Sequence, residues 1–188
     1  MSILLCNSYD DAIIAYVAKQ WKDNNLGIDL GRTMIQKLCY FLKAGGVPLD
    51  FKFDMYHYGP YSQELYYRMD ELLVDGIIAD ISQQKSKSVY IPGEQIEELL
   101  GNHDISEHIN DIDNIINLFD QFKPNEMELL ATIHYIQTTS AKYYGQVPEK
   151  DYVVEKVIDI KKERFSKDLV SRVYDVLEIE GLFGWNAN

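Results

Sequence analysis

The stretch of residues 53–81 constrains the fold more than any other part of this chain. Apolar and aromatic residues nearly alternate at its start, which predicts a short strand that Gly59 and Pro60 end. Ser62 is a favourable N-cap for a helix that then presents apolar residues at intervals of three and four. Gly76 is placed to end this helix in the left-handed conformation.

Two short apolar segments follow that helix, at 77–81 and 89–91, and the polar segment 83–88 separates them. Apolar runs on either side of a polar turn predict a hairpin. Upstream, the apolar periodicity predicts two helices, over 11–22 and 31–43. The order helix, helix, strand, helix, hairpin is typical of a winged helix-turn-helix.

We therefore expect an α+β protein that is mainly helical, with a winged helix-turn-helix-like domain over residues 1–93. The pattern of residues 94–188 predicts a C-terminal helical bundle. The alternative for this region is a degenerate second winged helix. Asn125 and Glu128 resemble a capping box at the start of one of its helices, and Ser166 caps the last. The apolar face predicted for this last helix consists of Leu169, Val173, Val176 and Leu177.

Three motifs carry a family resemblance: 34-MIQKLCYFLKAGG-46, 56-YHYGPYS-62 and the helix end 72-LLVDGII-78. In this order they resemble the YwgA-like proteins of bacteria and archaea and, more distantly, the Panacea (SocA-like) domain of antitoxins. The runs 128-ELLATIHYI-136 and 165-FSKDLVSRVYDVLEIEGL-182 are similar to the second half of YwgA-like chains. Because Panacea domains neutralise toxins, the resemblance implies a binding module rather than a catalyst.

The composition also favours binding over catalysis. The chain has 18 basic and 30 acidic residues, and its net charge of −12 opposes attraction to nucleic-acid phosphates and favours a basic partner. It contains 14 tyrosines, a residue that is enriched at protein interfaces. Cys6 and Cys39 show no disulfide pattern, which fits a reducing cytoplasm. No run approaches the ~18 apolar residues of a membrane span.

Metal-dependent or catalytic chemistry finds little support in the sequence. His103, Asp104, Glu107 and His108 offer ligating groups, but two histidines five residues apart fall on different faces of a helix. His134 lies among apolar residues and is expected to be a hydrogen-bonded core or boundary residue. Nucleophile motifs, phosphate-binding loops and paired carboxylates do not stand out. We expect a protein that is not an enzyme, with no metal and no cofactor.

Aromatic residues around the predicted third helix define a candidate partner-binding surface. Tyr58 and Tyr67 are expected to be exposed, whereas about half of the set Tyr56, Tyr61 and Tyr66 should pack the helix onto the sheet. Acidic neighbours would steer a basic protein, such as a toxin, and an arginine within the patch could anchor a carboxylate. The predicted contact residues are Tyr58, Tyr61, Glu64, Tyr67, Arg68, Asp70 and Glu71.

The competing hypothesis is a winged-helix transcriptional regulator that binds DNA. Its supporting cations are Arg32, Lys37, Lys43, Lys85 and Lys87. The outward face of the predicted recognition helix is neutral to acidic, which disfavours entry into a groove lined by phosphates. The favoured hypothesis is an antitoxin-like or regulatory protein that binds another protein, with a homodimer left open.

Overall fold

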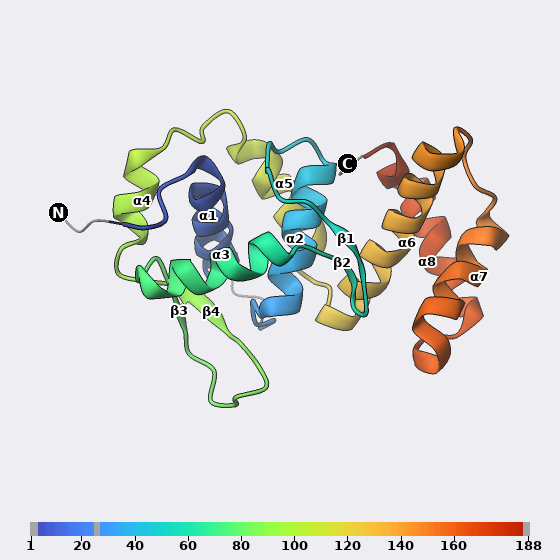
Figure 1. The fold of residues 1–188 in the computed structure, drawn as a ribbon, viewed down its shortest axis with the longest axis horizontal. Helices are drawn as coiled ribbons and strands as arrows, with labels where there is room; N and C mark the ends of the chain where they lie inside the picture. The colour runs from blue at the N-terminus through green and yellow to red at the C-terminus, as the bar shows by residue number, and fades with distance from the viewer. Residues whose placement is uncertain (1–3, 25–26, 186–188) are drawn as a thin grey trace.

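The computed structural model describes residues 4–24 and 27–185 and shows a mostly helical α+β protein (Figure 1), which confirms this part of the predicted fold class. The strands form two separate antiparallel hairpins, β1–β2 and β3–β4. None of the helices in the described ranges is both long and apolar enough to cross a membrane. The elements are α1 (Tyr9–Asn24), α2 (Arg32–Ala44), β1 (Asp54–Tyr56), β2 (Gly59–Tyr61), α3 (Gln63–Val74), β3 (Ile78–Asp80), β4 (Tyr90–Pro92), α4 (Ile96–Asn102), α5 (Ile109–Phe119), α6 (Pro124–Tyr144), α7 (Lys150–Lys161) and α8 (Lys167–Ile179).

Helix α2 lies at the centre of the core. Met34, Leu38 and Phe41 are fully buried, because α5, α6 and strand β2 pack around this helix. Phe41 stacks on Phe119 of α5 with the ring centroids 4.3 Å apart. Each such buried side chain stabilises the fold by roughly 1.5–3 kcal/mol. Because elements from both halves of the chain pack on α2, this helix joins the two halves of the molecule.

The hairpin β3–β4 packs against α1 and gains a further backbone contact from the segment that precedes α2. Ile78 pairs with Pro92 and Asp80 pairs with Tyr90. The Tyr90 N–H also donates to the Leu30 carbonyl at 2.9 Å, so Leu30 extends the hairpin along its second edge. The helices and the hairpin predicted for this region are confirmed, with their ends shifted by one or two residues.

The short strand predicted before Gly59 and Pro60 is present as β1, but these two residues were expected to be a break and not a strand, which was wrong. They belong to β2, which folds back on β1 so that Tyr56 opposes Gly59 and Met55 opposes Pro60. Gly59 has a φ of +85°, which lets the chain reverse within a two-residue turn. The proline is tolerated because β2 has a strand on only one side.

Serine caps locate the helix that follows this hairpin and the last helix of the chain. The Ser62 hydroxyl accepts the Leu65 N–H at 3.3 Å, and the Ser166 hydroxyl accepts the Leu169 N–H at 3.2 Å. Gly76 has a φ of +69° just after α3, as predicted. These signals fix the ends of α3 and therefore the direction in which its tyrosines point.

Helices α6, α7 and α8 pack against one another to form the C-terminal part of the fold. The start of α6 differs from the prediction, because Lys123 rather than Asn125 is the N-cap and Pro124 is the first helical residue. Glu126 accepts the hydrogen bond from the Lys123 N–H at 2.7 Å. Glu128, predicted for a cap, is instead turned into the interior.

Helix α8 buries Leu177 as predicted, but the rest of its buried face differs from the predicted one. Its buried residues are Val170, Tyr174 and Leu177. Leu169 is 37% exposed and Val176 is 49% exposed. Because apolar residues recur at intervals of three and four on both faces, the sequence pattern fits either face and does not choose between them.

Candidate partner-binding surface

Four tyrosines from the hairpin β1–β2 and from α3 form a continuous row of rings: Tyr56, Tyr61, Tyr66 and Tyr67, here called the tyrosine ladder. Tyr56 stacks on Tyr61 with the centroids 5.6 Å apart and the ring planes 29° apart. Tyr61 reaches Tyr66 at 6.4 Å, and Tyr66 meets Tyr67 edge to face at 5.5 Å. Such pairs contribute about 0.5–1.5 kcal/mol beyond area burial, so the rings hold one another in a defined arrangement.

Strand register and a helix cap place the rings in this row. The register sets Gly59 opposite Tyr56, so Tyr56 and Tyr61 become diagonal neighbours on one face of the hairpin. Ser62 starts α3 directly after Tyr61, and its carbonyl accepts the Tyr66 N–H at 3.1 Å. The first turn of α3 therefore carries the row from the hairpin onto the helix.

The tyrosine ladder is exposed at both ends. Tyr56 and Tyr67 each expose 60% of their surface, while Tyr61 and Tyr66 are half-buried. The predicted exposure of Tyr67 is confirmed. Of the three tyrosines considered for packing, Tyr56 does not pack inward, because it lies on the outer face of a two-stranded hairpin. Tyrosine binds partners at a low entropic cost, since its ring turns about only two bonds.

Arg32 of α2 supports the ladder from the side. Its guanidinium lies over the Tyr66 ring, 4.7 Å from the centroid, and its Nε–H points at the Tyr90 hydroxyl at 3.5 Å. A cation–π contact of this kind contributes about 0.5–1 kcal/mol at an exposed site. The charge of Arg32 thus orients a tyrosine of the ladder.

Three of the predicted contact residues on α3 are exposed carboxylates, Glu64, Asp70 and Glu71. They give the surface around the ladder a negative charge. Arg68 is less available than predicted, because its Nε lies 3.4 Å from a carboxylate oxygen of the buried Asp11 and its Nη1 lies 3.1 Å from Glu71. Its guanidinium is engaged by carboxylates of this chain, although its side chain is still 35% exposed, and the anchoring of a partner carboxylate stays a prediction.

Tyr58 is exposed as predicted, but it belongs to a different contact. Its ring faces the guanidinium of Arg164, 5.3 Å from the ring centroid, and 58% of its surface remains exposed. Arg164 ends the short 3-10 turn, Lys162–Arg164, that follows α7. Tyr58 therefore connects the turn of the hairpin to the C-terminal helices and lies outside the tyrosine ladder.

Charged side chains beside Tyr58 fix the tip of the hairpin β1–β2; three of them are buried and Arg164 is partly exposed. We call the four side chains Lys37, Glu128, Lys161 and Arg164 the hairpin anchor. The Glu128 carboxylate accepts a hydrogen bond from the Lys161 ammonium at 2.8 Å. It also binds Arg164 through two parallel bonds of 2.8 and 3.0 Å. This bidentate geometry is the strong form of an arginine–carboxylate pair.

Two ammonium groups of the anchor bind backbone carbonyls of the hairpin. Lys161 donates to the His57 carbonyl at 2.8 Å, and Lys37 donates to the Pro60 carbonyl at 2.7 Å. A Cβ at Gly59, between these residues, would lie 2.7 Å from Thr132 Oγ1. The tip therefore fits closely against α6 only because this residue has no side chain.

Burial sets the protonation of these lysines. Burial, and next the nearby Lys161 ammonium, lower the pKa of Lys37 to about 7, while Glu128 acts in the opposite direction. Burial also lowers the pKa of Lys161, against the effect of its bond to Glu128. Lys161 is both ion-paired and hydrogen-bonded, as a buried charge requires, whereas the bond shown for Lys37 is to the Pro60 carbonyl, which fits its lowered pKa.

Glu128, Lys161 and Arg164 were not predicted to belong to one cluster. The sequence signal that could have indicated a buried ion cluster is a charged residue on an otherwise apolar helix face, as for Lys37 and Lys161. Lys37 was predicted as a nucleic-acid contact, which was wrong because its ammonium is enclosed. The ammonium of Lys43, another predicted nucleic-acid contact, donates a hydrogen bond to the Phe51 carbonyl of this chain at 2.7 Å.

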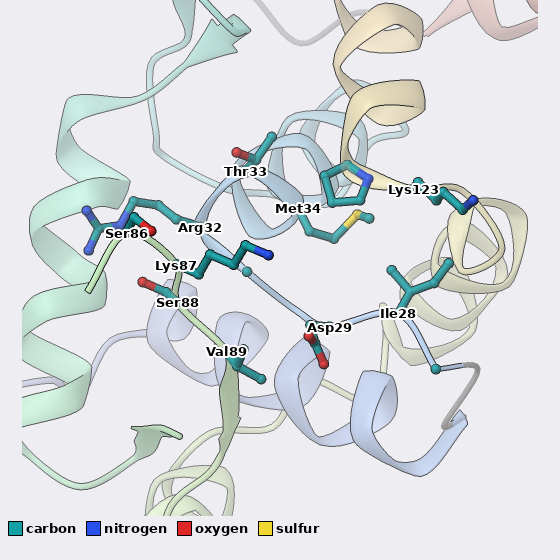
Figure 2. Close-up of a pocket in the computed structure, with 13 residues that line it drawn as sticks. Ile28, Asp29, Arg32, Thr33, Met34, Ser86, Lys87, Ser88, Val89 and Lys123 are labelled. Atoms are coloured by element: carbon teal, nitrogen blue, oxygen red, sulfur yellow. The ribbon is translucent and has the colours of Figure 1, made fainter. Parts of the chain in front are cut away.

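The remaining predicted cations lie around the loop between β3 and β4. Lys85 and Lys87 are exposed on this loop. Figure 2 shows Lys87 reaching over a cleft of about 440 Å³ between this loop, the start of α2 and Lys123 at the start of α6. The structure thus brings Arg32 and Lys87 to one cleft, which Asp29 also lines.

The histidines considered for metal binding have other contacts. His103 Nε2 lies 3.0 Å from the Asn7 side-chain oxygen, and His108 meets the Tyr9 ring edge to face at 6.4 Å. Within the described part of the chain, no group of three or more His, Cys, Asp or Glu side chains could hold a metal ion.

His134 is the buried, hydrogen-bonded core residue that the sequence predicts. Its Nε2 lies 2.9 Å from the Leu182 carbonyl, which can only accept, so Nε2 carries the proton. Its Nδ1 accepts from the Tyr40 hydroxyl at 2.6 Å. Burial lowers the pKa of His134 to about 4, against the effect of the bond to Leu182.

Fold and surface together define a mainly helical α+β protein with an exposed tyrosine ladder on an anchored hairpin. Over 56 residues the chain is 36% identical to YwgA of Bacillus subtilis (strain 168), an uncharacterized protein. The match covers 30% of this chain and 34% of YwgA, so it spans about a third of that relative. No family model matches the chain. The match supports the resemblance to YwgA-like proteins, and the relation to Panacea domains stays a prediction.

Proposed function

We propose that this protein is a non-enzymatic binding protein, antitoxin-like or regulatory, that captures a basic protein partner. The observation that carries the proposal is the tyrosine ladder, which is exposed at Tyr56 and Tyr67. Tyrosine is over-represented among the residues that dominate interface energetics. The exposed carboxylates Glu64 and Asp70 beside it, and to a lesser degree Glu71, which is paired with Arg68, would speed encounter with a basic surface.

The proposed mechanism is occlusion of a functional surface on the partner. A binding surface gains affinity when it is ordered before contact, because less conformational freedom is lost on association. The stacked rings and the hairpin anchor both provide such order. The distant resemblance to Panacea domains points the same way, since these domains neutralise toxins.

We place this activity in the cytoplasm. Cys6 and Cys39 are free thiols, and both are buried. Two free cysteines fit a reducing compartment better than an oxidising one.

Site-specific photo-crosslinking in the native host tests the proposal. A photoreactive phenylalanine analogue would replace Tyr67 of the ladder or, as the matched control, Tyr143, which is 81% exposed on α6. We expect one discrete crosslinked protein of basic character from position 67 and none from position 143. Equal crosslinking patterns from the two positions would contradict the proposal.

A second candidate function is DNA binding by a winged helix. The supporting observation is the hydrogen bond from Tyr90 to Leu30, which adds a third strand position to the hairpin β3–β4, as in the sheet of a winged helix. We propose on this basis that residues 1–93 form a winged helix, with α3 in the place of the recognition helix. The exposed Lys85 and Lys87 would then lie on the wing.

Charge makes this second candidate the weaker one. The exposed face of α3 carries carboxylates, which repel phosphates. A gel-shift series on the promoter region of its own operon, at low and at physiological salt, separates the two functions. Specific binding that is lost when Lys85 and Lys87 are both replaced by Glu would favour the regulator.

A further inference from the structure

Helix α8 has two apolar faces, and residues 4–24 and 27–185 cover only one of them. Val170, Tyr174 and Leu177 are buried against the neighbouring helices. The second face bears Leu169 and Val176, which are exposed, with the half-buried Val173 between them. These three residues follow one another at intervals of four and three, the spacing by which a helix presents one stripe to a partner.

This second face forms one wall of an apolar groove. Leu129 and Leu130 of α6, both almost fully buried, also line the groove, as do the half-buried Phe122 and Phe165. The groove has a volume of about 240 Å³. Its α8 wall extends over about 10 Å between Leu169 and Val176, which is two turns of a helix.

The charges at the groove select its occupant. Glu126 lines the groove, and Glu180 lies one turn beyond Val176 on the same face of the chain. The nearest cation on α8, Arg172, is paired with Asp168 at 3.0 Å. Arg164 lies over the Phe165 ring at 5.7 Å, but its guanidinium is bound to Glu128, and Glu126 accepts only the Lys123 backbone N–H among the contacts of the described residues. The charge left without an ion pair at the groove is therefore negative, which favours a cationic partner. A second copy of the chain would bring another net charge of −12 to the same place.

We propose that this groove binds an amphipathic helix of a basic protein. The partner helix would insert apolar side chains at positions i, i+3 or i+4, and i+7 between α6 and α8, with lysines or arginines along its flanks. Recognition of this kind is the helix-in-groove mode of peptide binding. It uses a surface that shares no residue with the tyrosine ladder.

The probe is a fluorescent peptide of about 18 residues, made of leucine and lysine with the leucines at heptad spacing. Fluorescence anisotropy with the full chain at about 0.15 M salt measures its affinity. Two control peptides complete the set: the same composition in scrambled order, and the same pattern with glutamate in place of lysine. We expect saturable binding of the patterned leucine–lysine peptide and at least roughly tenfold weaker binding of both controls.

The variants locate the binding on the groove. Val176→Lys places a charge in the groove, and the matched control Ile179→Lys adds the same charge at a position on α8 that is 80% exposed and does not line it. Circular dichroism verifies that both variants fold. We expect Val176→Lys to weaken the patterned peptide by roughly tenfold or more, and Ile179→Lys and Tyr67→Ala to leave it unchanged.

Three outcomes would overturn the proposal. Equal binding of the patterned and scrambled peptides would show attraction by net charge alone. Equal effects of Val176→Lys and Ile179→Lys would show that the groove is not the site. A dimer in sedimentation that only Val176→Lys dissociates would make a second copy the occupant. The groove and the tyrosine ladder are tested by different variants. A negative result for the groove therefore leaves the proposed function of the ladder untouched, and a negative result for the ladder leaves the groove proposal untouched.

Discussion

The Lys161 ammonium lies 2.8 Å from the Glu128 carboxylate, and both side chains are almost completely buried. The same ammonium binds the carbonyl of His57 in the turn of the hairpin β1–β2. One ion pair of α6 and α7 thereby holds the turn that connects Tyr56 to the other residues of the tyrosine ladder. The order of a surface in the N-terminal half depends on charges supplied by the C-terminal half.

Removing one partner of this ion pair should be strongly destabilising. Glu128→Gln leaves Lys161 buried without its counter-ion, and breaking a buried pair in this way costs on the order of 3–5 kcal/mol. The matched control is Glu155→Gln, which breaks the exposed pair with Lys167. We expect the control to change the free energy of unfolding by less than about 1 kcal/mol, measured by urea denaturation. Equal losses for both variants would contradict the anchoring role of Glu128.

Gly59→Ala tests the close fit of the hairpin tip. The added Cβ would meet Thr132 Oγ1 at 2.7 Å, and the residue also has a φ of +85°. Gly145 has a φ of +67° and nothing within 4 Å of its added Cβ, so Gly145→Ala carries only the backbone strain. That strain costs about 1 kcal/mol. We expect Gly59→Ala to lose at least about 1 kcal/mol more than Gly145→Ala in urea denaturation.

The protein should lose stability as the pH falls from about 6.5 to about 4, in part because of His134. In the unfolded chain this histidine binds a proton with a pKa near 6.5, whereas burial lowers its pKa in the folded state to about 4. Within this window the unfolded state binds more protons, so the free energy of unfolding falls with pH by up to about 1.4 kcal/mol per unit.

His134→Gln isolates this contribution. The variant is expected to be less stable at pH 7, because it loses one of the bonds to Tyr40 and Leu182. Its stability should nevertheless depend less steeply on pH between 6.5 and 4. Denaturation at a series of pH values gives both slopes, and parallel curves for the two proteins would contradict the assignment.

Lys37 should act in a higher pH window. Burial and the Lys161 ammonium lower its pKa from 10.5 to about 7, so the unfolded chain binds more protons than the folded one between these values. Stability should therefore rise with pH from about 7 to about 9.5, below the range in which free tyrosines ionise. We expect Lys37→Met to flatten this rise in denaturation measurements, and an unchanged slope would exclude Lys37 as its source.

Local signals in the sequence predicted much of the fold. The serine caps at Ser62 and Ser166 and the left-handed Gly76 located helix ends to within one or two residues. The strand β2 was missed because Gly59 and Pro60 are typical of turns, and only pairing across the hairpin makes them a strand. Nothing local distinguishes a glycine that ends a strand from one that lets it turn back.

The candidate site was predicted in part. Exposure of Tyr67 and of the α3 carboxylates follows from helical periodicity, so the sequence located them. The stacking of Tyr56 on Tyr61 and the pairing of Lys161 with Glu128 depend on contacts between distant segments. Periodicity also could not choose between the two apolar faces of α8, because both have the spacing of a buried stripe.

The most direct test of the central claim is the affinity of the purified protein for the partner recovered by crosslinking. Calorimetry would compare the wild type with Tyr56→Ala, Tyr67→Ala and the exposed control Tyr143→Ala, each verified as folded. We expect each ladder variant to lose at least about 2 kcal/mol of binding free energy, roughly thirtyfold in Kd, and the control to bind as the wild type does. Wild-type affinity in both ladder variants would show that the tyrosine ladder is not the partner-binding surface.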